Sequence, residues 1–119
     1  MSDLRSETKL IPSVRRANDA VVATVRGEID LHNSPQLRAD LLRFLEEEKP
    51  AKLVLNLGEV PYMDSSAIAV LVEALQKLRK QGGKIYLTQL QPRVKGLLEI
   101  ARLDTIFVIA ENEDAALSA

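Results

Sequence analysis

Cysteine and tryptophan are both absent from the 119-residue sequence, and His32 is its one histidine. The lack of cysteine excludes disulfides, thiol nucleophiles and cysteine-based metal centres. With one imidazole, a zinc site would depend almost wholly on carboxylates, an uncommon ligand set for that ion. We therefore predict no metal site and no cofactor. Only two Phe and two Tyr are present, so the core should be aliphatic.

Neither sign of charge is in excess, since 16 basic residues stand against 17 acidic ones. A nucleic-acid-binding protein usually carries a basic excess or stripe, so we expect no nucleic-acid partner. No apolar run approaches the ~20 residues that a membrane helix needs. The N-terminal segment MSDLRSETKL also lacks the apolar core of a secretory signal. These absences predict a cytoplasmic protein without membrane insertion.

The residues that are present suit one compact domain, with 46% hydrophobic and 28% charged residues. We expect a flexible tail over residues 1–8 and a domain over residues 9–119. Runs of β-branched residues predict strands, and apolar residues spaced three and four apart predict helices. The predicted strands span 9–16, 20–27, 52–57, 84–90 and 105–110, and the predicted helices span 34–49, 65–81, 91–103 and 111–119.

This order, β-β-α-β-α-β-α-β-α, predicts an α/β fold with a mixed, mostly parallel sheet, an N-terminal hairpin and about four helices. Ser34 followed by Pro35 is typical of a helix cap and first turn. The apolar run KLVLNL (52–57) is typical of a parallel strand that is buried on both faces. Gly82-Gly83 comes after a helix and before a strand, the reverse of a phosphate loop, and therefore predicts a helix stop.

The tripeptide Asp64-Ser65-Ser66 stands where a buried strand gives way to a helix. Asp64 is a natural N-cap, which makes Ser65 the first helical residue and Ser66 the second. Side chains at the carboxyl end of such a strand tend to be exposed, at the rim where open α/β sheets bind ligands. The spacing alone suits a purely structural cap as well as a functional hydroxyl. Tyr62 and Met63 suit either a recognition surface or the rim of the core.

Catalysis by Ser65 with His32 as the base is a second hypothesis, that of a small serine hydrolase. No G-x-S-x-G elbow surrounds the serine pair, and His32 lies in a polar turn typical of a solvated loop. Glu28 and Asp30 are two residues apart and would share a face on a strand. They could serve acid–base chemistry, a solvated edge or a contact patch. We predict no catalytic residue and no small-molecule substrate.

The stretch VLNLGEVPYMDSSAIAVLVEALQKLRKQGGKIYL resembles the signature of the STAS domain of bacterial anti-sigma factor antagonists. GEID (27–30) resembles the Gly-Glu-Leu-Asp element that this family carries earlier in the chain. The resemblance covers roughly residues 9–119 and agrees with the predicted order of elements. Ala67 departs from the pattern, because the family usually has Gly at this position.

The resemblance implies a switch between partners in the control of transcription. The serine after the aspartate, here Ser65, is phosphorylated in that family by the anti-sigma factor, which is itself a serine kinase; Ser66 is the second choice. The unmodified antagonist binds the anti-sigma factor and frees the sigma factor, and a serine phosphatase resets the cycle. The predicted partner-binding residues are Glu28, Asp30, His32, Asn33, Tyr62, Met63, Asp64, Ser65 and Ser66.

A third hypothesis stays within the same family. Some STAS domains are modules of a signalling assembly or subunits of a lipid-transporter complex, and they have no phosphorylation cycle. The serine pair favours the cycle, although a chain of this length suits either role.

Overall fold

The computed structural model describes residues 8–119, and it confirms the predicted order of strands and helices. The five strands are β1 (Ser13–Ala17), β2 (Ala20–Arg26), β3 (Lys52–Glu59), β4 (Lys84–Thr88) and β5 (Val108–Ala110). The four helices are α1 (Ser34–Glu48), α2 (Ser65–Lys80), α3 (Pro92–Ile100) and α4 (Glu113–Ser118). Within residues 8–119, no helix is long and apolar enough to cross a membrane.

The strands form one sheet in the order β1-β2-β3-β4-β5. β1 and β2 pair antiparallel as the predicted hairpin, and each further pair is parallel. The predicted mixed, mostly parallel sheet is therefore confirmed. Because β2, β3 and β4 run in the same direction, the loops that lead to α1, α2 and α3 all begin at the carboxyl ends of these strands, on one side of the sheet. The predicted site lies among these loops.

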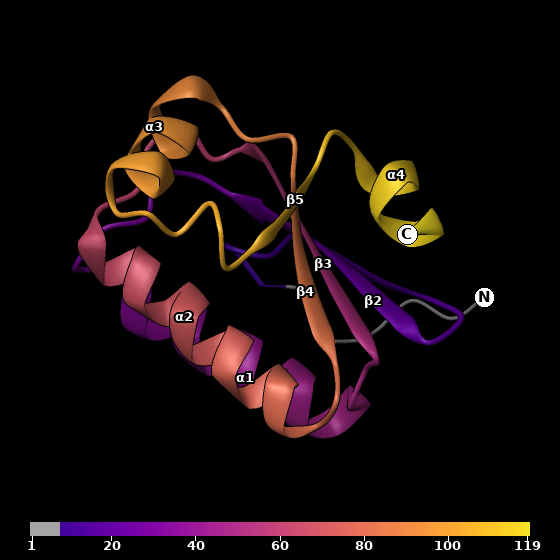
Figure 1. Ribbon diagram of the computed structural model, residues 1–119. Coiled ribbons are helices and arrows are strands. Elements are labelled where there is room, and N and C mark those ends of the chain that lie inside the picture. The colour runs from indigo at the N-terminus through magenta and orange to yellow at the C-terminus, as the bar shows by residue number, and fades with distance from the viewer. Residues whose placement is uncertain (1–7) are drawn as a thin grey trace.

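The helices lie on both faces of the sheet, with α1 and α2 side by side on one face and α4 across the other (Figure 1). The larger core lies between the sheet and the α1–α2 layer and is mainly aliphatic, as predicted. Leu53, Val54 and Leu55 have no exposed area, which confirms that β3 is buried on both faces. A smaller cluster under α4 contains Val22, Val54, Tyr86 and Ala116.

The start of α1 differs from the prediction. The N-cap residue is Asn33, and Ser34 is the first residue of the helix and is buried. The Asn33 side chain makes no cap bond, because its amide oxygen accepts a hydrogen bond from the Asp30 backbone N–H at 2.8 Å. The Ser34 N–H instead reaches the Asp30 carbonyl oxygen at 2.8 Å. The loop before α1 therefore replaces the expected serine cap.

The last strand and helix are shorter than predicted. Residues 105–107 belong to a turn, because the N–H groups of Ile106 and Phe107 both donate to the Leu103 carbonyl oxygen. Only β5 remains to pair with β4. Asn112 caps α4 by accepting a hydrogen bond from the Ala115 N–H at 2.8 Å, so the helix begins after the predicted position 111.

The expected tail, residues 1–8, lies outside the described residues except for Thr8. The Thr8 hydroxyl donates a hydrogen bond to the buried Asp40 carboxylate at 2.8 Å. The same hydroxyl accepts from the Ile11 N–H at 3.0 Å. These bonds fasten the described beginning of the chain to α1.

Candidate functional site

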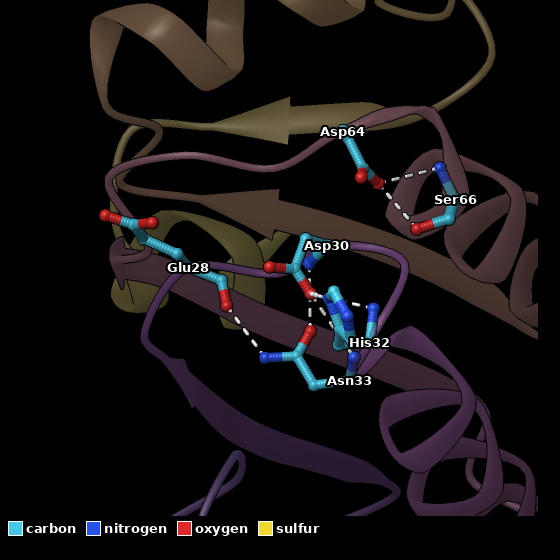
Figure 2. A network of polar contacts seen from close by, with 6 residues as sticks. All are labelled: Glu28, Asp30, His32, Asn33, Asp64 and Ser66. Carbon is cyan, nitrogen blue, oxygen red and sulfur yellow. Dashed lines mark hydrogen bonds and ion pairs between the residues drawn. The ribbon is translucent and has the colours of Figure 1, made fainter.

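Residues 63–66, which we call the serine turn, connect the segment after β3 to α2. The segment that follows β2 lies directly beside it, through an isolated parallel bridge between Ile29 and Met63. The Ile29 N–H donates to the Tyr62 carbonyl oxygen, and the Asp64 N–H donates to the Ile29 carbonyl oxygen, both at 3.1 Å. This pairing brings the GEID segment and the serine turn together across about 35 residues of chain, and Figure 2 shows the two groups side by side.

Asp64 is the N-cap residue of α2, with an extended backbone. One oxygen of its carboxylate accepts both the N–H of Ser66, at 2.9 Å, and the Ser66 hydroxyl, at 2.5 Å. The hydrogen bond from the Ser66 hydroxyl is the largest cause that lowers the pKa of Asp64 from its ordinary value of 3.8. Partial desolvation opposes the shift, whereas backbone N–H groups, that of Leu31 among them, reinforce it. The cap is therefore a charged carboxylate with one serine already bound to it.

Ser65 differs from Ser66 in being exposed and unengaged. It is the first residue of α2, and no hydrogen bond to its hydroxyl is formed within residues 8–119. The first turn of α2 also contains no acidic side chain. The unsatisfied N–H groups of a helix start favour negative charge. Of the two candidate hydroxyls, Ser65 is thus the more exposed, and the one without a hydrogen-bond partner among the described residues.

Ala67, where the family usually has glycine, has no exposed area. Its methyl group therefore packs into the core under α2 and does not face an approaching molecule. Alanine also favours the helix over glycine by about 1 kcal/mol. The departure strengthens the helix start without adding bulk to the exposed side of the turn.

The predicted contact residues after β2 form a closed loop. β2 ends at Arg26, so Glu28 and Asp30 do not lie on a strand as a face-sharing pair. The Asp30 carboxylate accepts from the His32 N–H at 2.8 Å, and the Asn33 side-chain amide donates to the Glu28 carbonyl oxygen at 2.9 Å. Asp30 and Asn33 therefore mainly hold the loop in shape, while Glu28 and His32 present their side chains to solvent (Figure 2).

The structure adds exposed apolar residues that the sequence patterns did not single out. Leu31, next to the serine turn, is 73% exposed, and Ile100, at the end of α3, is 85% exposed. A shallow groove of about 300 Å³ lies between α3 and the serine turn and is lined by Tyr62, Met63, Arg93, Gly96, Leu97 and Ile100. The sequence did contain a signal for these exposed residues. Leu31 stands in a polar turn, and Ile100 does not lie on the apolar face of its helix.

Arg93 gives this groove one positive charge. Its guanidinium lies 5.1 Å from the centroid of the Tyr62 ring, a distance typical of a cation–π contact. The stacked pair fixes the position of the tyrosine beside the serine turn. The groove is thus a mainly apolar surface with a cationic wall, and Met63 of the serine turn is part of its lining.

The arrangement does not resemble a hydrolase site. The His32 ring is 97% exposed, and its Nδ1 atom lies 3.8 Å from the Asp30 carboxylate. Among the described residues, no hydrogen bond joins His32 to Ser65. In the same part of the chain, no three His, Asp or Glu side chains are grouped to hold a metal ion. What the site offers is an accessible hydroxyl on a rigid, partly apolar surface.

The lowered pKa of Asp64 has a testable consequence. Because the folded-state pKa lies below the ordinary value, the ionised carboxylate stabilises the fold above about pH 4. This contribution is lost as the pH falls through the folded-state pKa. We expect Asp64→Asn to be less stable than the wild type at pH 7, and the difference to shrink toward pH 2. Urea unfolding at several pH values measures it.

A Ser66→Ala variant tests the cause of the shift. Removal of the hydroxyl should raise the pKa of Asp64 toward 3.8, because that hydrogen bond is the largest contribution. NMR titration of the Asp64 carboxyl carbon measures the change. An unchanged pKa in Ser66→Ala would contradict the cap geometry described above.

The chain is similar to known proteins over most of its length. A family model described as the STAS domain matches residues 12–116. The anti-sigma-B factor antagonist of Bacillus subtilis is 34% identical over 101 residues, which cover 84% of this chain and 91% of the relative. A solved anti-sigma factor antagonist from Mycobacterium paratuberculosis has a TM-score of 0.80 at 26% identity, with 88% of each chain covered. The Bacillus cell fate determinant SpoIIAA in its phosphorylated form shares the fold, with a TM-score of 0.68 at 20% identity over 89% of this chain and 96% of that one.

Proposed function

Because the chain belongs to the STAS domain family, we propose that it is an anti-sigma factor antagonist whose binding is switched by phosphorylation of Ser65. Antagonists of this family are regulatory proteins and not enzymes. The observation that supports the proposal is the contrast between the two serines. The Ser66 hydroxyl is bound to Asp64, whereas the Ser65 hydroxyl is exposed and free among the described residues.

The partner we propose is an anti-sigma factor with serine kinase activity. ATP bound to that partner supplies the phosphoryl group. The Ser65 oxygen attacks the γ-phosphorus, the bond from that phosphorus to the β–γ bridging oxygen breaks, and ADP leaves. The hydroxyl proton passes to a base of the kinase. A serine phosphatase hydrolyses the phosphoserine and restores the binding form.

The binding surface would combine both segments around the serine turn. Glu28, His32 and Ser65 supply its polar part, and Tyr62 supplies the edge of the apolar groove, whereas the predicted contact residue Met63 is only 3% exposed and packs mainly into the core. Leu31 and Ile100, which the sequence analysis did not single out, are exposed beside the serine turn and extend the proposed binding surface. An apolar centre with a polar rim is typical of protein–protein interfaces. Asp30, Asn33, Asp64 and Ser66 act mainly by keeping the two loops in place.

Phosphorylation at this position changes the interface more than the fold. It adds about −1.5 to −2 charges beside Asp64. The start of α2 offsets part of the repulsion, because negative charge there is favourable by about 0.3–1 kcal/mol. An interface that packed a neutral hydroxyl must now desolvate a dianion. The expected result is a folded protein that no longer binds.

The decisive experiment is incubation with ATP and the anti-sigma factor, followed by intact mass measurement and peptide mapping. We expect the mass of one phosphate group to be added, at Ser65. Ser65→Ala should abolish the addition, and Ser66→Ala should retain it, because only the first hydroxyl is free. Binding without any phosphorylation would contradict the switch and would favour the non-switching STAS module.

A further inference from the structure

α3 presents two stripes of residues along its length. The buried stripe contains Val94 and Leu98, which have no exposed area and pack into the larger core. The second stripe has the spacing i, i+3, i+4, i+7, which places residues on one face of a helix. It consists of Arg93, Gly96, Leu97 and Ile100. All four of these residues line the shallow groove beside the serine turn, so α3 faces the core with one stripe and the groove with the other.

Gly96 lies inside α3, where the fold does not require a glycine. Glycine is less favourable than alanine in a helix, because its backbone loses more freedom on folding. The backbone of Gly96 is helical and lacks the positive φ that favours glycine. Apart from the helix backbone and its two chain neighbours, an added Cβ would meet no heavy atom of the described residues within 4 Å. The missing side chain therefore makes room for nothing in the described chain, and it leaves the groove open.

The lining of the groove fits a partner of definite chemistry. Among the described residues that line it, Arg93 is the only charged one, and within residues 8–119 it forms no ion pair. The contact with the Tyr62 ring holds the guanidinium in place. Ile100 adds a largely exposed apolar side chain. An apolar surface with one cation free of an ion pair fits an apolar side chain that has a carboxylate beside it.

We infer that this groove selects the anti-sigma factor, by receiving a large apolar side chain of that partner against Gly96 while a neighbouring carboxylate of the partner pairs with Arg93. The inference rests on the proposed function. Met63 belongs both to the lining of the groove and to the serine turn, so one partner can cover both. The bare helix backbone at position 96 allows that partner a close approach. Gly96 and Arg93 thus determine specificity, whereas Ser65 is the switch.

A second copy of this chain fits the groove less well. Two copies that met at the same groove would be related by a two-fold axis, and their Arg93 side chains would lie near each other. These like charges would repel. The charge of the groove therefore favours a different protein that carries an acidic group at this place.

Calorimetric titration with the anti-sigma factor that phosphorylates Ser65, together with thermal melts, tests the inference. Gly96→Gln should weaken binding roughly tenfold or more, because a long polar side chain then fills the apolar groove. Its melting temperature should rise by a few degrees, since glutamine favours a helix more than glycine does. Affinity and stability should thus change in opposite directions, which a purely structural role of Gly96 would not produce.

Arg93→Glu should also weaken binding roughly tenfold, because the carboxylate of the partner would meet a like charge. The fold tolerates this change, since Arg93 is exposed and acidic residues are favourable in the first turn of a helix. Lys95 supplies the matched controls, because it is exposed on α3 and borders a separate cleft, together with Ile109. Lys95→Gln and Lys95→Glu should both bind within about threefold of the wild type.

The outcomes separate this inference from the proposed function. If the wild type binds and is phosphorylated at Ser65, but Gly96→Gln and Arg93→Glu bind equally well, the groove has no role and only the inference fails. An equal loss of affinity in the Lys95 controls would overturn it too. A wild type that neither binds nor is phosphorylated would contradict the proposed function, and the inference would fall with it. In sedimentation velocity, a dimer of the wild type alone that Gly96→Gln abolishes would assign the groove to a second copy and overturn the inference.

Discussion

A Ser65→Asp variant is expected to bind the anti-sigma factor roughly a hundredfold more weakly than the wild type, at an unchanged melting temperature. The aspartate places a charge on the exposed side of the serine turn, where the wild type has a neutral hydroxyl. The fold tolerates it, because the start of α2 favours negative charge. The partner does not, since burial of an unpaired carboxylate costs about 3 kcal/mol, equivalent to the hundredfold loss.

Ser65→Ala should bind like the wild type and should remain bound after incubation with ATP. Gln81→Glu is the charge-matched control, because it adds the same charge at the opposite end of α2, on an exposed residue. Titration by isothermal calorimetry and thermal melts give both quantities for each variant. Equal affinity of Ser65→Asp and Ser65→Ala would contradict the switch. A large fall in the melting temperature of Ser65→Asp would show that the charge acts on the fold.

The sequence predicted those elements whose signals are local. The Asp64-Ser65-Ser66 cap follows from side-chain chemistry at a helix start, and the structure places these residues at the start of α2. The buried strand at residues 52–57 follows from a continuous apolar run, and it was confirmed because both faces of β3 are covered. In each case the neighbours in sequence determine the outcome.

The features that the sequence missed depend on hydrogen bonds within an irregular loop or on contacts between distant segments. Asn33 replaced Ser34 as the cap of α1 because the loop after β2 uses Asn33 to bind its own backbone. The exposed Leu31 and Ile100 meet the serine turn only because of the Ile29–Met63 bridge and the placement of α3. No spacing within one segment carries that information. The position of the candidate hydroxyl could therefore be predicted from neighbouring residues in the sequence. The residues that surround it could not, because tertiary contacts bring them there.

An Ile29→Ala variant tests that dependence directly, and we expect it to lower the free energy of unfolding by about 2–5 kcal/mol. Ile29 has no exposed area, and its backbone joins the loop after β2 to the serine turn. Loss of the buried side chain leaves a cavity beneath that junction, so the two loops should no longer be held in register. We also expect the amide protons of Ile29 and Asp64 to exchange faster with solvent. The affinity for the anti-sigma factor should fall by roughly tenfold, because the proposed binding surface spans both loops.

Two control variants separate loss of stability from loss of site geometry. Ile29→Val removes one methylene group and should cost only about 0.5–1.5 kcal/mol, with binding retained. Leu41→Ala creates a cavity of similar kind under α1, where Leu41 has no exposed area, but it leaves the loop junction intact. Below its unfolding transition, Leu41→Ala should therefore bind the partner within about threefold of the wild type although it is comparably destabilised. If Leu41→Ala weakens binding as much as Ile29→Ala does, the junction at Ile29 has no special role, and partner affinity follows global stability alone.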